Sequence, residues 1–355
     1  MSRTRLVVVG GGQSGLAAAR VGRDRGWDSV VLEAGPEPVG SWPDYYDSLH
    51  LFSPRKFSSF PGYEFPGPAA SYPARDEVVD YLRGYASWLG TDIRTNARVA
   101  DVTPDSAGGF TAHLADTGAV SGDVLIAASG SFANPYIPQV VGHEEFSGQL
   151  LPVAAYRSPE PFAGKRVVVV GAGNSAVQVG YELAEVADVS LAVRDRVRLV
   201  SQVVAGRDLH WWLRLTRADL LPPGILNRVV TGTPVIDTGR YQQALRTGQL
   251  DERRMFTAFT SDGVVWPNGT RERVDAVIFA TGYRPHLPYL DSLGAFDADG
   301  APRHRHGIST RVPGLGFLGL EFQRTFSSNT LRGVHRDAGF VVGALADQRR
   351  RVAVG

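Results

Sequence analysis

Two glycine-rich segments of the chain have the composition and spacing that bind a diphosphate. The first spans residues 10–15 (GGGQSG) and the second spans residues 171–176 (GAGNSA). Glycine lets the backbone turn tightly and bring its N–H groups close to phosphate oxygens, and a helix that begins there adds the positive end of its dipole. Two such segments predict two bound dinucleotides. The residues expected to contact them are Gly10, Gly12, Gln13, Ser14, Gly15, Gly171, Gly173, Asn174, Ser175 and Ala176.

Residues of opposite charge follow the two glycine segments at the same distance. Glu33 lies 23 residues after Gly10 (33 − 10), and Arg194 lies 23 residues after Gly171 (194 − 171). In dinucleotide-binding folds a carboxylate here accepts a hydrogen bond from a free ribose 2′-hydroxyl, whereas a guanidinium pairs with a 2′-phosphate. We therefore expect FAD or NAD at the first segment and NADP at the second. Asp195 leaves open an unphosphorylated ribose, and hence NAD, at the second segment.

The sequence around each glycine segment predicts a strand, a turn and a helix in that order. Continuous apolar runs precede the segments at residues 6–9 and 167–170, as is typical of parallel strands buried on both faces. The following stretches, 16–25 and 177–187, are rich in Ala, Leu, Glu and Arg and favour helices. This order of elements is the one that the diphosphate-binding mechanism requires.

A second internal repeat supports two complete nucleotide-binding units. Residues 123–130 (DVLIAASG) parallel residues 275–282 (DAVIFATG), each a buried strand that ends in small residues. Two ordinary core strands are the alternative interpretation. Pro135 and Pro285 follow these turns, where we expect the chain to pass from one unit to the other.

These patterns predict an α/β protein with two dinucleotide-binding, Rossmann-like, three-layer domains. We expect residues 1–148 and 276–355 to form a discontinuous FAD-binding domain and residues 149–275 to form an inserted NADPH-binding domain. In this scheme the strand at 275–280 returns to the first domain. The proline-rich stretch 152–164 is the expected linker into the second domain, and the two linkers act as hinges.

Composition and charge narrow the class of protein. The 355 residues are 43% hydrophobic, which is typical of a globular enzyme, and the formal net charge of +1 argues against nucleic acid as a partner. No apolar run is long enough to span a bilayer. Residues 1–5 lead directly into the first strand and leave no room for a signal peptide, so we expect a cytoplasmic protein.

The absence of cysteine excludes several chemistries. No cysteine pair can relay electrons to a disulfide, and there is no thiolate nucleophile or cysteine-ligated metal. His304 and His306 are spaced like two metal ligands but have no evident third, so we expect no metal site.

Several short motifs beyond the glycine segments resemble a known family. They are residues 40–42 (GSW) before 46–49 (YDSL), residues 60–62 (FPG) with 65–66 (FP), and residues 280–285 (ATGYRP). With these motifs the chain resembles the flavin-containing monooxygenases over nearly its whole length. It is most similar to the short bacterial branch, which also looks like plant YUCCA-type enzymes and arsenic-resistance monooxygenases.

The resemblance implies FAD and NADPH as cofactors and adds residues to the expected site. A helix beginning near Leu331 would direct its dipole at the flavin, although an ordinary C-terminal helix is the alternative. The added cofactor contacts are Ser41, Trp42, Val99, Gly130, Gly282 and Leu331. The candidates at the edge of the flavin, where the catalytic residues are otherwise unknown, are Phe52, Ser53, Gln323 and Asn329.

Two positions depart from the family pattern. The family fingerprint FxGxxxHxxx followed by an aromatic residue reads FSGQLLPVAAY at 146–156, so Pro152 replaces the histidine. Phe52 lies where animal-type members place an asparagine near the flavin.

The implied activity is NADPH-dependent transfer of one oxygen atom from O2 to a nitrogen, sulfur or carbonyl centre of a small molecule through a C4a-(hydro)peroxyflavin. Because Pro152 and Phe52 depart from the pattern, an NADPH oxidase or flavin reductase that releases hydrogen peroxide is an alternative. A non-catalytic protein that senses flavin or NADPH is another. A homodimer is one option for its assembly.

Overall fold

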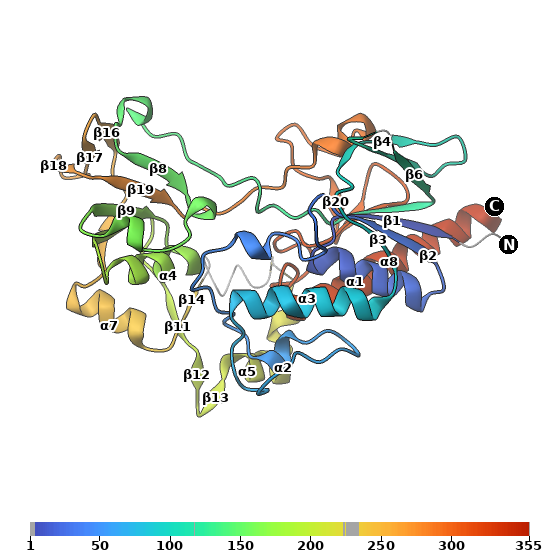
Figure 1. Ribbon diagram of the computed structural model, residues 1–355, viewed down its shortest axis with the longest axis horizontal. Helices are drawn as coiled ribbons and strands as arrows, with labels where there is room; N and C mark the ends of the chain where they lie inside the picture. Colours follow the sequence, from blue (N-terminus) through green and yellow to red (C-terminus); the bar gives the residue numbers. More distant parts are fainter. Residues whose placement is uncertain (1–3, 117, 223, 225–233, 355) are drawn as a thin grey trace.

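Two separate β-sheets organise the chain in the computed structural model, which describes residues 4–116, 118–222, 224 and 234–354 (Figure 1). The first sheet has the strand order β20-β21-β22-β7-β1-β2-β3, and the second has the order β15-β10-β9-β19-β8. The first sheet draws strands from both ends of the chain, and the second lies between them in sequence. The predicted α/β fold with a discontinuous first unit and an inserted second unit is confirmed.

The first unit has three layers. In its sheet β1 lies between β2 and β7 and is parallel to both. Helices cover one face of the sheet, and a β-meander covers the other. The helices are α1 (Gln13–Asp24), α3 (Arg75–Leu89) and α8 (Leu331–Val354), and the meander is β4 (Val99–Pro104), β5 (Phe110–Leu114) and β6 (Ala119–Gly122). The strands of the sheet are β1 (Arg5–Val9), β2 (Asp28–Leu32), β3 (Asp92–Arg94), β7 (Val124–Ala127), β20 (His304–Arg305), β21 (Ile308–Ser309) and β22 (Leu315–Phe317).

The second unit repeats this plan with a parallel sheet. Helices α4 (Asn174–Leu183) and α7 (Arg240–Thr247) pack on one face, and the meander of β16 (Ala258–Thr260), β17 (Gly263–Val265) and β18 (Arg271–Arg273) packs on the other. The sheet consists of β8 (Gln149–Pro152), β9 (Arg166–Val170), β10 (Asp188–Val193), β15 (Asp251–Arg254) and β19 (Ala276–Phe279). Both helices predicted after the glycine segments are present, and each begins three residues earlier than expected because its first turn is part of the segment.

The two units also share individual hydrogen bonds at equivalent positions of the internal repeat. In the first unit Asp123 accepts a hydrogen bond from the backbone N–H of Arg5 at 2.8 Å, and in the second Asp275 accepts one from Arg166 at 2.8 Å. Each aspartate therefore ties the start of the repeated strand of its unit, β7 or β19, to the start of the strand before the glycine loop, β1 or β9. The two echoing strands, β7 and β19, are equivalent members of two equivalent sheets.

This equivalence corrects the predicted domain boundary. Strand β19 pairs in parallel with β9 and β8, so the prediction that residues 275–280 return to the first unit is wrong. The reason is the glycine segment itself, which needs the end of β19 beside it, as the first segment needs the end of β7. The second unit therefore continues through Phe279, and its division from the first unit lies after this strand.

The predicted linkers are also displaced. Pro152 ends strand β8 in register with Phe279, so the proline-rich stretch lies inside the second unit. The chain instead crosses between the units near residues 131–140 and again near 281–287, and these two crossings bond to each other (Figure 1). Tyr136 donates its backbone N–H to Gly282 at 2.9 Å, and the Arg284 guanidinium lies 3.8 Å from the centre of the Tyr136 ring.

Shorter elements complete the chain. A segment of the second unit extends toward α2 and α3 of the first unit, carrying α5 and the β12–β13 hairpin (Figure 1). None of the described helices is both long and apolar enough to cross a membrane. The shorter elements are η1 (Trp42–Asp44), α2 (Arg55–Ser58), η2 (His143–Glu145), η3 (Val153–Ala155), η4 (Glu160–Phe162), β11 (Leu199–Ser201), β12 (Val203–Val204), β13 (Arg207–Asp208), α5 (Leu209–Thr216), η5 (Ala218–Leu220), β14 (Val235–Asp237) and η6 (Pro288–Leu293).

The first glycine loop gives a stability prediction. A Cβ added at Gly15 would lie 1.8 Å from the carbonyl oxygen of Gly10, so Gly15→Ala must displace the loop backbone. We expect it to lower the free energy of unfolding by about 1–3 kcal/mol, measured by urea denaturation. Gly339→Ala is the matched control, because nothing lies within 4 Å of its added Cβ in α8 and it should stabilise by up to about 1 kcal/mol. Equal stabilities for the two variants would contradict the close approach.

Candidate functional site

A single cavity of about 2600 Å³ is bordered by both glycine loops and by residues of both units. Ligand pockets usually have volumes of roughly 300–1,000 Å³, so this cavity has room for more than one large ligand. It lies at the carboxyl ends of β1 and β9, which is where open α/β sheets bind ligands. The two predicted dinucleotide loops therefore share one space.

Contacts with Ala128 and Glu33 fix the conformation of the first glycine loop. Gly10 adopts a φ of +105°, and a Cβ there would lie 2.6 Å from the carbonyl oxygen of Ala128 at the end of β7, so only glycine fits. The Glu33 carboxylate accepts hydrogen bonds from the backbone N–H groups of Gly11 at 2.5 Å and Gly35 at 2.7 Å. No side chain caps the N-terminus of α1, which leaves its first N–H groups available to an anion.

The second glycine loop repeats this arrangement. Gly171 has a φ of +140°, and a Cβ there would lie 2.5 Å from the carbonyl oxygen of Ala280 at the end of β19. The N-terminus of α4 also lacks a side-chain cap, and nothing lies within 4 Å of a Cβ built at Gly173. Asn174 donates to the carbonyl of Pro234 and accepts from the N–H of Ile236, which fixes the loop against β14. The loop therefore presents bare backbone to the cavity.

Arg194 directly follows β10 and lines the cavity with an exposed side chain. Asp195, Arg196 and Arg198 line the same part of the cavity. Glu33, which follows β2, and Arg194, which follows β10, thus both line the common space.

Most of the predicted contact residues line the cavity. They are Gly10, Gly12, Gln13, Ser14, Glu33, Ser41, Trp42, Val99, Gly130, Gly171, Gly173, Asn174, Ser175, Arg194, Gly282 and Leu331. The flavin-edge candidates Phe52, Ser53 and Asn329 line it as well. Gly15 and Ala176 do not, because they lie in the first turns of α1 and α4, behind the loops.

Gln323 also lies away from the cavity lining. Its side chain is buried, and its Oε1 accepts a hydrogen bond from the N–H of Leu320 at 3.3 Å. A Cβ at Gly307 would lie 2.1 Å from Gln323 Nε2, so the amide packs against the β20–β21 turn. Gln323 therefore supports the fold here rather than facing the proposed flavin. The helix predicted near Leu331 does begin at that residue as α8.

Pro152, which replaces the fingerprint histidine, is not among the residues that line the cavity. The other fingerprint positions are structural: Phe146 is buried in the core of the second unit, and the Tyr156 hydroxyl donates to Glu182 at 2.8 Å. Residue 152 thus lies at the end of β8, outside the cavity lining.

Sequence reasoning missed the segment that carries α5. His210, Leu213 and Asp219 from this segment line the cavity opposite Arg332 of α8. The Asp208 side chain caps α5 by accepting from the N–H of His210 at 2.7 Å, and it also contacts His210 Nδ1 at 3.0 Å. An Asp two residues before a His at a helix start was the only sequence signal available.

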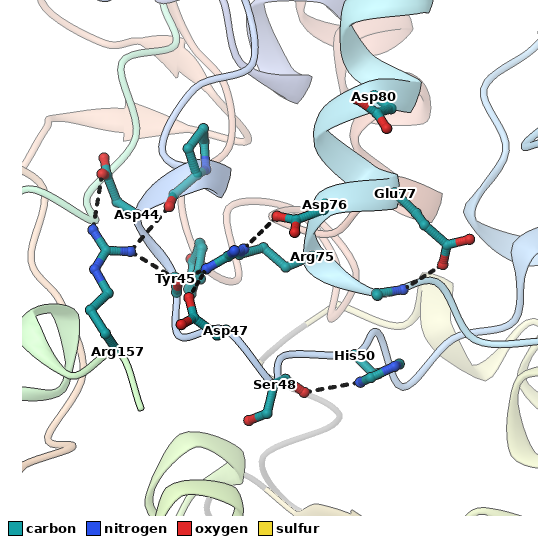
Figure 2. A network of polar contacts seen from close by, with 12 residues as sticks. Asp44, Tyr45, Asp47, Ser48, His50, Arg75, Asp76, Glu77, Asp80 and Arg157 are labelled. Atoms are coloured by element: carbon teal, nitrogen blue, oxygen red, sulfur yellow. Dashed lines mark hydrogen bonds and ion pairs between the residues drawn. The ribbon is translucent and has the colours of Figure 1, made fainter. Parts of the chain in front are cut away.

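A polar network joins the two units beside the cavity (Figure 2). Arg157 of the second unit and Arg75 of α3 both donate to the backbone carbonyl of Tyr45, at 3.0 and 2.8 Å. Arg157 also pairs with Asp44, and Arg75 with Asp47. Because most of these carboxylates are exposed, the network positions the 44–47 loop more than it stabilises the fold.

Burial shifts the pKa of several groups that line the cavity. It raises the pKa of Tyr45 to about 12 and raises the pKa of the Glu321 carboxyl, so the tyrosine is neutral at pH 7. Burial lowers the pKa of His210, and the opposing effect of its hydrogen bond with Asp208 does not overcome it. The imidazole is therefore neutral at pH 7, with Nδ1–H directed at Asp208 and with no hydrogen-bond partner for Nε2 among the described residues.

The paired dinucleotide-type loops around one cavity define a class of oxidoreductase that uses a flavin and a pyridine nucleotide. The chain matches the pyridine nucleotide-disulphide oxidoreductase family over residues 7–218. The flavin-containing monooxygenase from Stenotrophomonas maltophilia has a TM-score of 0.85 and 30% identity, covering 98% of this chain and 99% of that one.

Curated relatives agree with the structural match. The indole-3-pyruvate monooxygenase YUCCA1 of Oryza sativa subsp. japonica is 33% identical over 79% of this chain and 77% of its own length. An uncharacterized CzcO-like oxidoreductase of Geobacillus kaustophilus is 27% identical over 95% of this chain and 97% of its own length. The chain belongs to the flavin-containing monooxygenase family, as its motifs predicted. Its lack of cysteine separates it from the disulphide reductases that share the fold.

A second buried histidine gives a pH prediction. His335 of α8 lies against Phe60, with ring centroids 3.9 Å apart, and burial, with a smaller effect of the Arg20 charge, lowers its pKa to about 3. Because the unfolded chain takes up this proton near pH 6.5, His335 makes the folded state lose stability as the pH falls from about 6.5 toward 3.

We expect His335→Leu to reduce the pH dependence of the unfolding free energy by up to about 1.4 kcal/mol per pH unit between pH 6 and 4. Urea titrations of both proteins at several pH values measure this slope. The two slopes should agree at pH 8, where the imidazole is neutral in both states. Parallel curves throughout would show that His335 does not carry the effect.

Proposed function

We propose that the protein is an FAD-containing, NADPH-dependent monooxygenase that transfers one oxygen atom from O2 to a small organic substrate. The observation that carries this proposal is the shared cavity of about 2600 Å³ with a glycine loop and a ribose-reading residue of opposite charge on each side. The family to which the chain belongs supports flavin and pyridine nucleotide use. The identity of the two dinucleotides rests on Glu33 and Arg194.

The first site fits FAD. Its pyrophosphate would lie against the bare backbone of Gly12 and the uncapped N-terminus of α1, and Glu33 would accept from the adenosine ribose. The cavity continues along Ser41 and Trp42 to Asn329 and Leu331 at the start of α8. The positive end of that helix dipole would favour negative charge on a reduced flavin ring by roughly 1 kcal/mol.

The second site fits NADPH. Its pyrophosphate would lie at Gly173 and the uncapped N-terminus of α4, and Arg194 would pair with the 2′-phosphate. Tyr283, which stacks on Phe132 at 5.1 Å between the ring centroids, borders the cavity where the chain crosses between the units.

When bound, the flavin supplies the redox chemistry: it accepts a hydride from the nicotinamide and passes electrons to O2. The protein's own residues hold the two rings in one cavity, exclude water and place hydrogen-bond donors around them. The described part of the cavity wall is rich in apolar side chains near the start of α8, including Phe52, Leu213 and Phe326, and these would keep the reacting region dry.

An anaerobic NADPH titration followed by O2 tests the function. We expect NADPH to bleach the visible absorbance of the bound flavin, and O2 then to restore it with NADPH consumption matched by an oxygenated product. Immediate reoxidation with stoichiometric hydrogen peroxide, for every substrate offered, would instead indicate an NADPH oxidase. A flavin that NADPH fails to bleach would indicate a non-catalytic sensor.

Substitution of Arg194 tests the choice of nucleotide. Loss of a charge-assisted contact to the 2′-phosphate should raise the KM for NADPH by about 10- to 100-fold in Arg194→Ala. The KM for NADH, which has no such phosphate, should change by less than about twofold and serves as the internal control. An equal rise for both nucleotides in steady-state flavin reduction would contradict the assigned role.

A further inference from the structure

Arg332, in the first turn of α8, has a buried guanidinium that lacks a hydrogen-bond partner in the described part of the chain. Only 7% of its side chain is exposed, and no described protein group accepts a hydrogen bond from its Nε, Nη1 or Nη2. A guanidinium keeps its proton and offers five N–H donors in a planar fork that matches a carboxylate. The residue also lines the main cavity.

The nearest carboxylate is already engaged. Asp219 accepts a hydrogen bond from Arg336 at 3.0 Å, while its distance to Arg332 Nε is 3.6 Å, too long for a hydrogen bond. Asp219 is itself buried, so two guanidinium groups share one carboxylate there. The charge of Arg332 is therefore only partly compensated by Asp219.

The second carboxylate nearby is engaged as well. Asp208 accepts from the Tyr72 hydroxyl at 2.5 Å and contacts His210 Nδ1 at 3.0 Å. His210 is neutral at pH 7, so it adds no positive charge beside Arg332, and Asp208 keeps its negative charge but already accepts hydrogen bonds from Tyr72 and His210. Among the described residues Arg332 thus has two carboxylates nearby but no hydrogen-bond acceptor for its enclosed N–H groups, and it lines the cavity. An anionic ligand group that reached the guanidinium would supply the missing acceptor.

Apolar side chains of the same cavity indicate what the remainder of such a ligand would be. Phe52, Leu213 and Phe326 line the same cavity, and Phe52 stacks on His210 with ring centroids 6.1 Å apart. These side chains offer contact to an apolar or aromatic group. Arg332 also follows Leu331, at the helix start where the flavin is proposed to lie.

We propose that Arg332 binds the carboxylate of the substrate, and that the substrate class is a small organic acid whose apolar part packs against Phe52, Leu213 and Phe326. This inference rests on the proposed function, because it takes the cavity beside α8 as the place where substrate meets flavin. It assigns Arg332 as a specificity-determining residue and Asp219 as the carboxylate that competes with the substrate for it.

The test compares two probes of equal shape, 3-phenylpropionate and its neutral amide, 3-phenylpropionamide. Binding of each to the oxidised flavin-loaded enzyme is measured by calorimetry and by the change in flavin absorbance. We expect the wild type to prefer the acid by at least about tenfold, and Arg332→Gln to bring the two affinities within about twofold of each other. Arg332→Lys should retain part of the preference because it keeps the charge.

Asp219→Asn provides a variant with the opposite expected direction. It removes the competing negative charge, so the preference for the acid should increase by about threefold or more. Arg246→Gln, an exposed arginine on α7, is the matched control and should leave both affinities unchanged. Flavin content and far-ultraviolet circular dichroism establish that each variant is folded.

Three results would overturn the inference. They are equal binding of acid and amide by the wild type, an undiminished preference for the acid in Arg332→Gln, and altered absorbance of the bound flavin in that variant without any probe. The last would show that the guanidinium serves the flavin instead. These outcomes are distinct from failure of the proposed function, since a protein can prefer the acid yet fail to be reduced by NADPH, or be reduced by NADPH and ignore the acid.

Discussion

A helix N-terminus can bind a diphosphate only where no side chain covers its backbone N–H groups, and this constraint determines the loop structure in both halves of the chain. In each unit the first glycine takes a φ that other residues avoid and lies against the carbonyl that ends a neighbouring strand, Ala128 in one case and Ala280 in the other. The helix that follows has no side-chain cap. Strand order, loop shape and helix start are thus fixed together, and the cavity results from two such ends facing each other.

The elements around the glycine loops could be predicted from sequence because they obey local rules. Apolar runs predicted β1 and β9, and equal offsets after the glycine segments singled out Glu33 and Arg194, both of which line the cavity. The boundary at 275/276 failed because strand membership depends on which neighbour a strand pairs with, and that is a long-range property. The repeat of DVLIAASG in DAVIFATG already indicated that the second of these strands belongs to the second unit, since equivalent strands occupy equivalent sheets.

The remainder of the site depends on contacts that no spacing encodes. His210 and Asp219 line the cavity because a segment of the second unit extends to the first unit. Asp219 lies 3.6 Å from Arg332 Nε and accepts its hydrogen bond from Arg336 instead. Gln323 shows the converse: the sequence made it a flavin-edge candidate, yet its amide packs against Gly307. Residues that select a substrate are therefore the least accessible to single-sequence reasoning.

The two crossings between the units lie beside each other, with Tyr136 hydrogen-bonded to Gly282 and Arg284 to Asn134. The inserted unit consequently leaves its host and returns to it at almost the same point. Such a module can be exchanged for another of different size without stretching the host sheet, since only a closely spaced pair of ends has to be rejoined. The hydrogen bonds between the two crossings also mean that a rotation of one unit against the other must move both crossings together.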